Sequence, residues 1–134
     1  MNTKNVFLTT ALAATAVLAE INVHQNQVGF LTNGPKQIAV TGAVGKSIVF
    51  KDADGNTALT VKAPETSLWE PANEEASLVD FSEITTPGTY QAYVGGEAVG
   101  YPIVISDNAL EGITKASLKF FYFQRSSMEL TEEF

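Results

Sequence analysis

Residues 80–106 constrain the fold of this 134-residue chain more than any other stretch. Two segments within it, residues 88–94 and 98–106, are rich in β-branched and aromatic side chains, and a Gly-Gly pair separates them. That pattern predicts two strands joined by a tight turn. Because Pro102 has no backbone N–H to donate to a neighbouring strand, the second strand is predicted to lie at a sheet edge or to carry a bulge.

A corner that carries a tyrosine precedes the first of these strands. Pro87 and Gly88 change the direction of the chain, and Tyr90 follows two residues after the glycine. This order resembles a tyrosine corner, in which a phenol hydrogen-bonds back to the backbone across the arch of a β-sandwich. We therefore expect Pro87, Gly88 and Tyr90 to form a structural corner.

Further short strand patterns precede this corner. They are separated by turn residues at intervals of roughly 8–12 residues, which is typical of a sandwich of two sheets. These additional strands are expected over residues 21–23, 37–41, 47–51, 58–62 and 76–81. The polar segment 64–73 around Trp69 is expected to be irregular. The fold class that the sequence predicts is an all-β sandwich.

After residue 106 the periodicity changes to that of a helix. Asp107 or Asn108 is expected to cap it, because Asn108 with Glu111 three residues later resembles a capping box. Bulky side chains occur on every side of this helix, and a helix that is apolar all round is normally buried all round. One face of a small sandwich cannot cover it, so we expect these side chains to pack against another domain in sequence beyond this chain. They are Leu118, Phe120, Phe121, Tyr122 and Phe123.

The N-terminus has the features of an export signal. Lys4 supplies a positive charge, residues 6–18 form an uncharged apolar run, and Val17 and Ala19 are small residues where a signal peptidase recognises its substrate. Cleavage is expected before Glu20, which makes residues 1–19 a signal peptide and the protein an exported one. The alternative is a buried N-terminal helix. The run is shorter than the roughly 20 apolar residues of a membrane span, so no membrane association is expected after cleavage.

Composition excludes several kinds of activity. The chain has 15 acidic and 8 basic residues and a formal net charge of -7, whereas a nucleic-acid-binding protein normally presents a basic face. It contains no cysteine, which excludes disulfides, thiolate metal sites and cysteine nucleophiles. No nucleic-acid partner and no cofactor are expected.

Three polar groups could be sites, but each has a simpler interpretation. Residues 52–56 (Asp-Ala-Asp-Gly-Asn) could be a calcium loop, but the glycine is at the fourth position instead of the sixth, so a hairpin turn is favoured. Glu74 and Glu75 are adjacent, so on an extended segment their carboxylates point apart. His24 has no second metal ligand near it in the sequence. We therefore expect no catalytic residue and no metal site.

Three aromatic residues raise the possibility of carbohydrate binding. Exported β-sandwiches can stack sugars on flat rings, and Trp69, Tyr93 and Tyr101 could supply such a platform. The sequence does not show that the three rings are coplanar and exposed. Packing in the core or between domains is the favoured role for them.

Four segments in order resemble one family. Residues 26–30 (Asn-Gln-Val-Gly-Phe) with Gly-Pro-Lys at 34–36, Asp-Phe-Ser at 80–82 with Thr-Pro-Gly-Thr-Tyr at 86–90, and Tyr-Pro-Ile-Val-Ile at 101–105 resemble the immunoglobulin-like N-terminal domain of family 9 glycoside hydrolases. Residues 115–125 resemble the first helix of the catalytic domain that follows in those enzymes. The family usually has Cys-Gly after this helix, where Ser126 and Ser127 stand here.

The resemblance implies a cellulase-like parent enzyme that acts on β-1,4-glucan. In that family an (α/α)6 barrel beside the sandwich performs inverting hydrolysis with two carboxyl groups roughly 6.5–9.5 Å apart. No position of this chain matches the motifs of those catalytic residues, so none is assigned and the chain alone is expected to be inactive.

The expected organisation has three parts: a signal peptide at 1–19, an immunoglobulin-like β-sandwich at 20–106, and the truncated start of a catalytic domain at 107–134. The expected partners are the missing barrel of the same polypeptide and β-glucan. The alternative is a free-standing sandwich module that binds polysaccharide or has a structural role.

Overall fold

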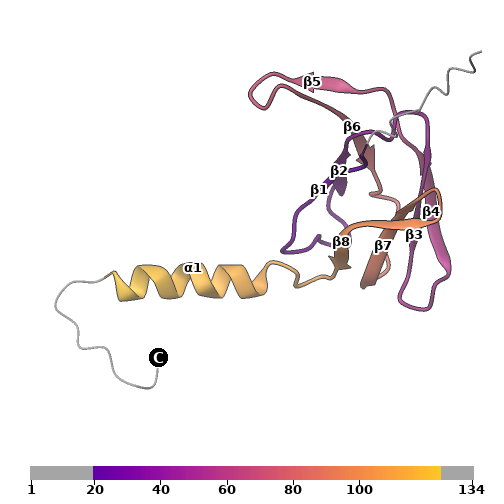
Figure 1. Cartoon of the computed structure of the whole chain (residues 1–134). Helices are drawn as coiled ribbons and strands as arrows, with labels where there is room; N and C mark the ends of the chain where they lie inside the picture. The colour runs from indigo at the N-terminus through magenta and orange to yellow at the C-terminus, as the bar shows by residue number, and fades with distance from the viewer. Residues whose placement is uncertain (1–19, 125–134) are drawn as a thin grey trace, which may run out of the picture.

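The computed structural model describes residues 20–124, which form eight strands followed by one helix (Figure 1). The strands are β1 (Val23–His24), β2 (Gln37–Val40), β3 (Ser47–Lys51), β4 (Thr57–Lys62), β5 (Ser67–Trp69), β6 (Glu74–Asp80), β7 (Gly88–Val94) and β8 (Glu97–Ile105), and the helix is α1 (Glu111–Phe123). The predicted signal peptide lies outside the described residues. Within residues 20–124, no helix is long and apolar enough to cross a membrane.

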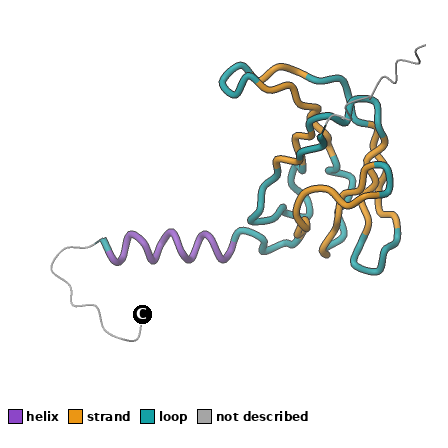
Figure 2. Tube along the Cα trace, viewed as in Figure 1, coloured by secondary structure: helices purple, strands orange, loops and turns teal. Residues whose placement is uncertain are grey.

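The strands form two four-stranded sheets. Figure 2 shows the strand segments in orange along the trace. The first sheet has the order β1-β2-β6-β5 and the second sheet the order β4-β3-β7-β8. Neighbouring strands pair antiparallel throughout both sheets. The predicted fold class, an all-β sandwich followed by one helix, is therefore confirmed.

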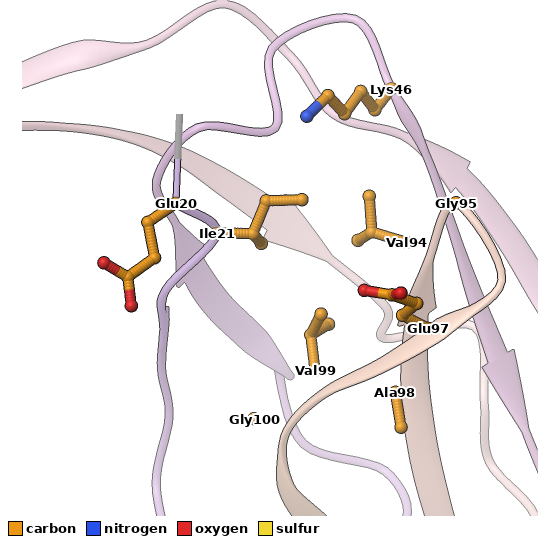
Figure 3. A pocket seen from close by; sticks show the side chains of 9 residues that line it. All are labelled: Glu20, Ile21, Lys46, Val94, Gly95, Glu97, Ala98, Val99 and Gly100. Atoms are coloured by element: carbon orange, nitrogen blue, oxygen red, sulfur yellow. The ribbon is translucent and has the colours of Figure 1, made fainter. Parts of the chain in front are cut away.

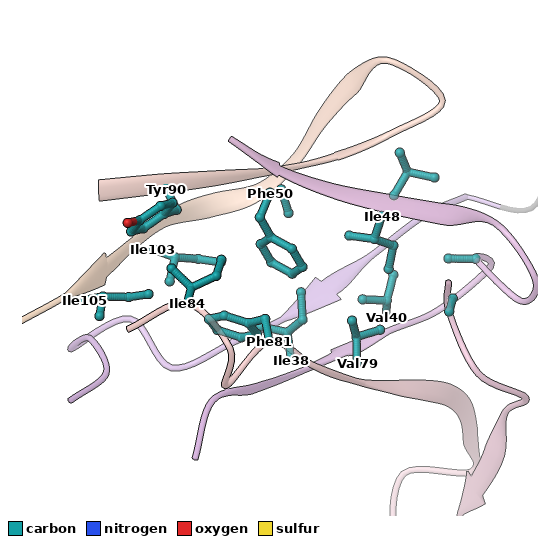
Figure 4. Packing of buried hydrophobic residues seen from close by; sticks show 14 residues of the cluster. Ile38, Val40, Ile48, Phe50, Val79, Phe81, Ile84, Tyr90, Ile103 and Ile105 are labelled. Carbon is teal, nitrogen blue, oxygen red and sulfur yellow. The ribbon is translucent and has the colours of Figure 1, made fainter. Parts of the chain in front are cut away.

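Alternate residues of β2, β3, β6, β7 and the end of β8 face a core between the sheets (Figure 4). In β2 and β3, for example, Ile38, Ile48 and Phe50 are fully buried while their neighbours in the strand are more exposed. The Phe81 ring stacks on the Phe50 ring at a centroid distance of 4.9 Å and meets the Phe30 ring edge-on at 5.2 Å. This period of two is what a half-buried strand requires, and it makes the sandwich a complete apolar core.

The last strand has both features that Pro102 predicted. β8 is at the edge of the second sheet, and its pairing with β7 shifts register between Tyr90 and Ala92. At this irregularity the Gln91 side chain donates a hydrogen bond of 2.8 Å to the carbonyl of Val99. An amide side chain thus bonds to a backbone carbonyl of β8 at the place where the ladder shifts register.

Two local predictions were wrong. Segment 64–73 is not wholly irregular, because residues 67–69 form β5 and pair with β6. The helix begins at Glu111 with Leu110 as its N-cap and no side-chain capping bond, so neither Asp107 nor Asn108 caps it. The Asn108 amide instead contacts the Glu111 carboxylate at 3.4 Å, while its oxygen accepts from the Ser106 hydroxyl at 2.5 Å. Those bonds hold Asn108 in a turn before the helix.

Candidate docking surface

Helix α1 presents large apolar side chains to solvent. None of its 13 residues is buried, and Leu118, Phe120 and Phe121 are 67%, 57% and 69% exposed. Figure 1 shows α1 extending away from both sheets. Burial of each such side chain contributes about 1.5–3 kcal/mol, so covering this helix is favourable.

The rings near the end of α1 contact neighbouring side chains of the same helix. Phe120 and Phe121 meet edge-on at 5.7 Å, Tyr122 and Phe123 meet edge-on at 5.6 Å, and the Lys119 ammonium lies 5.4 Å from the Phe123 ring centre. Tyr122 and Phe123 are half-buried, and the other three residues of the predicted packing set are exposed. The structure therefore places all five predicted packing residues on one helix that the sandwich does not cover.

The joint between sandwich and helix is held by the segment before β2. The Phe30 N–H donates to the Val104 carbonyl at 2.8 Å, and the Ser106 N–H donates to the Phe30 carbonyl at 2.9 Å. Gly29 has a φ of +123°, and a Cβ there would lie 3.0 Å from the Val104 oxygen and 3.3 Å from the Ala109 Cβ. Residues 29 and 30 therefore pack against both the last strand and the linker between β8 and α1. Only a glycine fits at position 29 without strain.

A buried lysine supports the same joint. Lys36 is fully buried, and its ammonium donates to the carbonyls of Thr32 and Gly34 at 2.7 and 3.0 Å. The Thr32 hydroxyl in turn donates to the carboxylate of Asp107, at the start of the linker. Backbone carbonyls thus satisfy the buried charge and fix the loop that holds the linker. Sequence reasoning missed this role, and its only signal was the Gly-Pro-Lys segment.

The predicted corner has the geometry of a tyrosine corner. Tyr90 is buried, and its hydroxyl donates a hydrogen bond of 2.9 Å to the carbonyl of Thr86. Its ring lies over Gly88, since the nearest ring carbon is 3.5 Å from where a Cβ would stand. The bond joins the start of β7 to the loop before Pro87, which is the contact that defines a tyrosine corner.

The 52–56 segment is a tight turn built on one carboxylate. Asp52 accepts hydrogen bonds from the backbone N–H groups of Asp54 and Asn56, at 3.0 and 2.8 Å, and from the Asn56 amide at 3.2 Å. The bonds from Asn56 and from the backbone hold the pKa of the Asp52 carboxyl below its usual value. The carboxylate oxygens therefore serve the turn, and no group of three or more His, Cys, Asp or Glu side chains gathers among residues 20–124.

The side chains of Glu74 and Glu75 have different partners in the structure. Glu74 meets His24 with 3.5 Å between Oε1 and Nε2, whereas Glu75 accepts from the Thr66 hydroxyl at 3.4 Å. They point to opposite faces of β6, as adjacent residues of a strand do. The pair does not form an acid–base dyad.

The three aromatic candidates are not brought together. Trp69 is on β5 in the first sheet, while Tyr93 and Tyr101 are on β7 and β8 of the second. The Lys51 ammonium lies 4.8 Å from the centre of the Tyr93 ring and covers it. No ring contact joins these three residues, so they do not form a shared platform for sugar stacking.

A hollow of about 700 Å³ lies between residues 20–21 and the β7–β8 turn (Figure 3). Ile21, Val94 and Val99 line its apolar side, and Lys46 and Glu97 stand at its edges. None of its lining residues is aromatic, so it lacks the flat rings on which sugars stack.

Several known proteins are similar to this chain in sequence or in structure. A xyloglucan-specific endo-beta-1,4-glucanase of Bacteroides ovatus is 30% identical over 122 residues, which are 90% of this chain and 20% of that protein. A cellodextrinase of Butyrivibrio fibrisolvens is 34% identical over 110 residues, 81% of this chain and 20% of that protein. A solved Bacteroides ovatus GH9 structure superposes with a TM-score of 0.71 at 32% identity, over 82% of this chain and 20% of its own.

The chain thus spans about a fifth of the length of these relatives. The family model described as the cellulase N-terminal Ig-like domain matches residues 19–99, which include every strand except the end of β8. The chain therefore belongs to the family of cellulase N-terminal Ig-like domains, the immunoglobulin-like domain of GH9 cellulases.

Proposed function

We propose that this chain is the non-catalytic N-terminal support domain of an exported β-1,4-glucan hydrolase, whose catalytic acid and base lie in polypeptide beyond α1. The observation that carries the proposal is the uncovered helix. A domain that worked alone would have no use for a helix with Leu118, Phe120 and Phe121 exposed, since such a surface promotes aggregation. In this proposal Leu118, Phe120, Phe121, Tyr122 and Phe123 pack against the rest of the catalytic domain.

The relatives support the substrate class. They are a xyloglucan-specific endo-beta-1,4-glucanase, a cellodextrinase and, at 26% identity over 110 residues, an endoglucanase of Cellulomonas fimi. We assign a β-1,4-glucan as the substrate of the complete enzyme on this basis. The corresponding domain boundaries are a signal peptide at 1–19, the sandwich at 20–106 and the start of the catalytic domain at 107–134.

Hydrolysis measurements on two proteins test this proposal. The purified chain is expected to release no reducing sugar from soluble β-glucan, whereas the product of the gene extended beyond Phe134 is expected to release it. A matched preparation from cells with an empty vector controls for contaminating hydrolases. Activity of the 134-residue chain above that control contradicts the proposal, and so does a stop codon directly after Phe134.

Export is tested separately. The protein recovered from outside the cytoplasm is expected to begin at Glu20, as measured by intact mass spectrometry. An intact N-terminus on a cytoplasmic protein would show that residues 1–19 are not a signal peptide.

A further inference from the structure

The outer edge of β8 has the properties that lead a strand to pair with another molecule. β8 is an edge strand of the second sheet and, with nine residues, the longest strand within residues 20–124. Two of its apolar side chains, Tyr101 and Val104, are 62% and 43% exposed. A long edge of this kind offers unpaired N–H and C=O groups to a second backbone, so native proteins normally block it.

The end of this edge is blocked by an earlier segment of the same chain. The Phe30 N–H donates to the Val104 carbonyl at 2.8 Å, and the Ser106 N–H donates to the Phe30 carbonyl at 2.9 Å. Pro102 has no N–H to offer to a neighbouring strand. The next backbone groups along the edge are those of Tyr101.

The Gln25 side chain pairs with the backbone of Tyr101. Its Nε2 donates to the Tyr101 carbonyl at 2.9 Å, and its Oε1 accepts from the Tyr101 N–H at 3.3 Å. A side-chain amide has the same kinds of donor and acceptor as a peptide group, and opposite residues of an antiparallel ladder exchange both bonds in this way. Gln25 therefore takes the place of a neighbouring strand at residues 100–102, which have no register partner in β7.

Gly100 makes room for this contact. Its φ is +68°, and a Cβ there would lie 2.7 Å from the Gln25 Oε1 and 3.0 Å from the Val23 Cβ. A side chain at position 100 would therefore displace the Gln25 amide. Val23 belongs to β1, an edge strand of the first sheet, so the edges of the two sheets meet beside Gln25.

We propose that the Gln25 amide closes the free edge of β8, so that a second copy of this chain cannot pair with this strand. A second copy is the partner to exclude, because two identical edges are self-complementary when their strands run antiparallel. Gly100 admits the amide, and Phe30 pairs with the end of the same edge. This closure lies within the sandwich and does not depend on the polypeptide that follows α1.

Hydrogen exchange tests whether Gln25 closes the edge. Gln25→Ala removes both bonds, and Gln25→Met removes them while keeping the length of the side chain. Gln27→Ala is the matched control, because this glutamine is exposed and only two residues away. In the 134-residue chain at low concentration, exchange of the Tyr101 N–H is expected to be at least roughly tenfold faster in both Gln25 variants and unchanged in the control. Mass spectrometry with fragmentation around Tyr101 measures it.

Sedimentation velocity over a range of protein concentrations tests the consequence for association. The self-association constant of Gln25→Ala is expected to exceed those of the wild type and Gln27→Ala at least roughly tenfold. Helix α1 is the same in every variant, so its exposed side chains contribute equally to each measurement. Gln25→Lys is expected to lose the two bonds and yet to associate no more than the wild type, because a lysine on an edge strand opposes pairing.

Three outcomes would overturn the proposal. The first is unchanged exchange of the Tyr101 N–H in the Gln25 variants. The second is faster exchange without stronger association, which would mean that the amide only holds the local backbone. The third is equally strong association of Gln25→Ala and Gln25→Lys, which would place the contact away from the β8 edge. Thermal melting establishes that each variant folds, and Gln25→Met decides both measurements if Gln25→Ala does not fold.

Discussion

Phenylalanines in the sandwich and in α1 have opposite environments. Phe50 and Phe81 are 0% and 1% exposed and stack on each other between the sheets, whereas Phe120 and Phe121 are 57% and 69% exposed. The same side chain is thus buried by residues of this chain in one region and left in solvent in the other. The sandwich is complete with the residues it has, and the helix needs a surface that residues 20–124 do not supply.

This difference separates two uses of apolar residues. In the sandwich they follow a period of two and stabilise the fold that contains them. On α1 they surround the helix and can stabilise only an association. The following substitutions test whether the two regions differ in energy as they do in exposure.

The largest effect is expected for Phe81→Ala in comparison with Phe121→Ala. Removing the Phe81 ring leaves a cavity beside the rings of Phe30 and Phe50, which typically costs about 3–5 kcal/mol of unfolding free energy. Phe121→Ala is expected to change the unfolding free energy by less than about 0.5 kcal/mol, as is usual at exposed sites. Urea unfolding followed by circular dichroism measures both, and a large loss for Phe121→Ala would mean that α1 packs on the sandwich.

A smaller effect is expected at the tyrosine corner. Tyr90→Phe removes the hydroxyl that donates to the Thr86 carbonyl and leaves a part-buried acceptor unpaired, at a cost of about 1 kcal/mol. Tyr101→Phe is the matched control, because the Tyr101 side chain is mostly exposed. Equal unfolding free energies for the two variants would remove the corner from the contacts that stabilise the sandwich.

The smallest effect is expected at Asp52 and depends on pH. Its folded-state pKa lies below the usual value of 3.8, so its contribution to stability is present above that pH and is lost as pH falls through the folded-state pKa. The melting temperature of Asp52→Ala should therefore lie below that of the wild type at pH 6–7, and the gap should close toward pH 2. Asp54→Ala, whose carboxylate accepts no hydrogen bond in the turn, should show no such closing gap in a series of thermal melts.

Much of the fold could be predicted because it follows from local patterns. The strands on either side of the Gly-Gly turn, the edge position of Pro102 and the Asp-Gly hairpin all follow from backbone chemistry at single residues. β5 could not be predicted in this way, because residues 67–69 are all exposed and show no alternation. The helix start was misplaced because Asn108, a good capping residue, instead bonds to Ser106 and Glu111.

The sequence predicted the apolar residues of the docking surface but not the contacts that hold its joint. The helical spacing alone indicated that α1 would lack cover. No local pattern marks Lys36 for burial, which follows from long-range contact between its loop and Ser82.

The pairing of Phe30 with the end of β8 has a practical consequence for shortening the chain. The beginning and the end of the sandwich close on each other there, with Gly29 against Val104 and Thr32 bonded to Asp107. Trimming from either terminus therefore damages the same contact, and a fragment that starts after Phe30 should lose order in its last strand first. Any recombinant fragment intended to keep the sandwich should retain residues 21–107, whatever is attached beyond them.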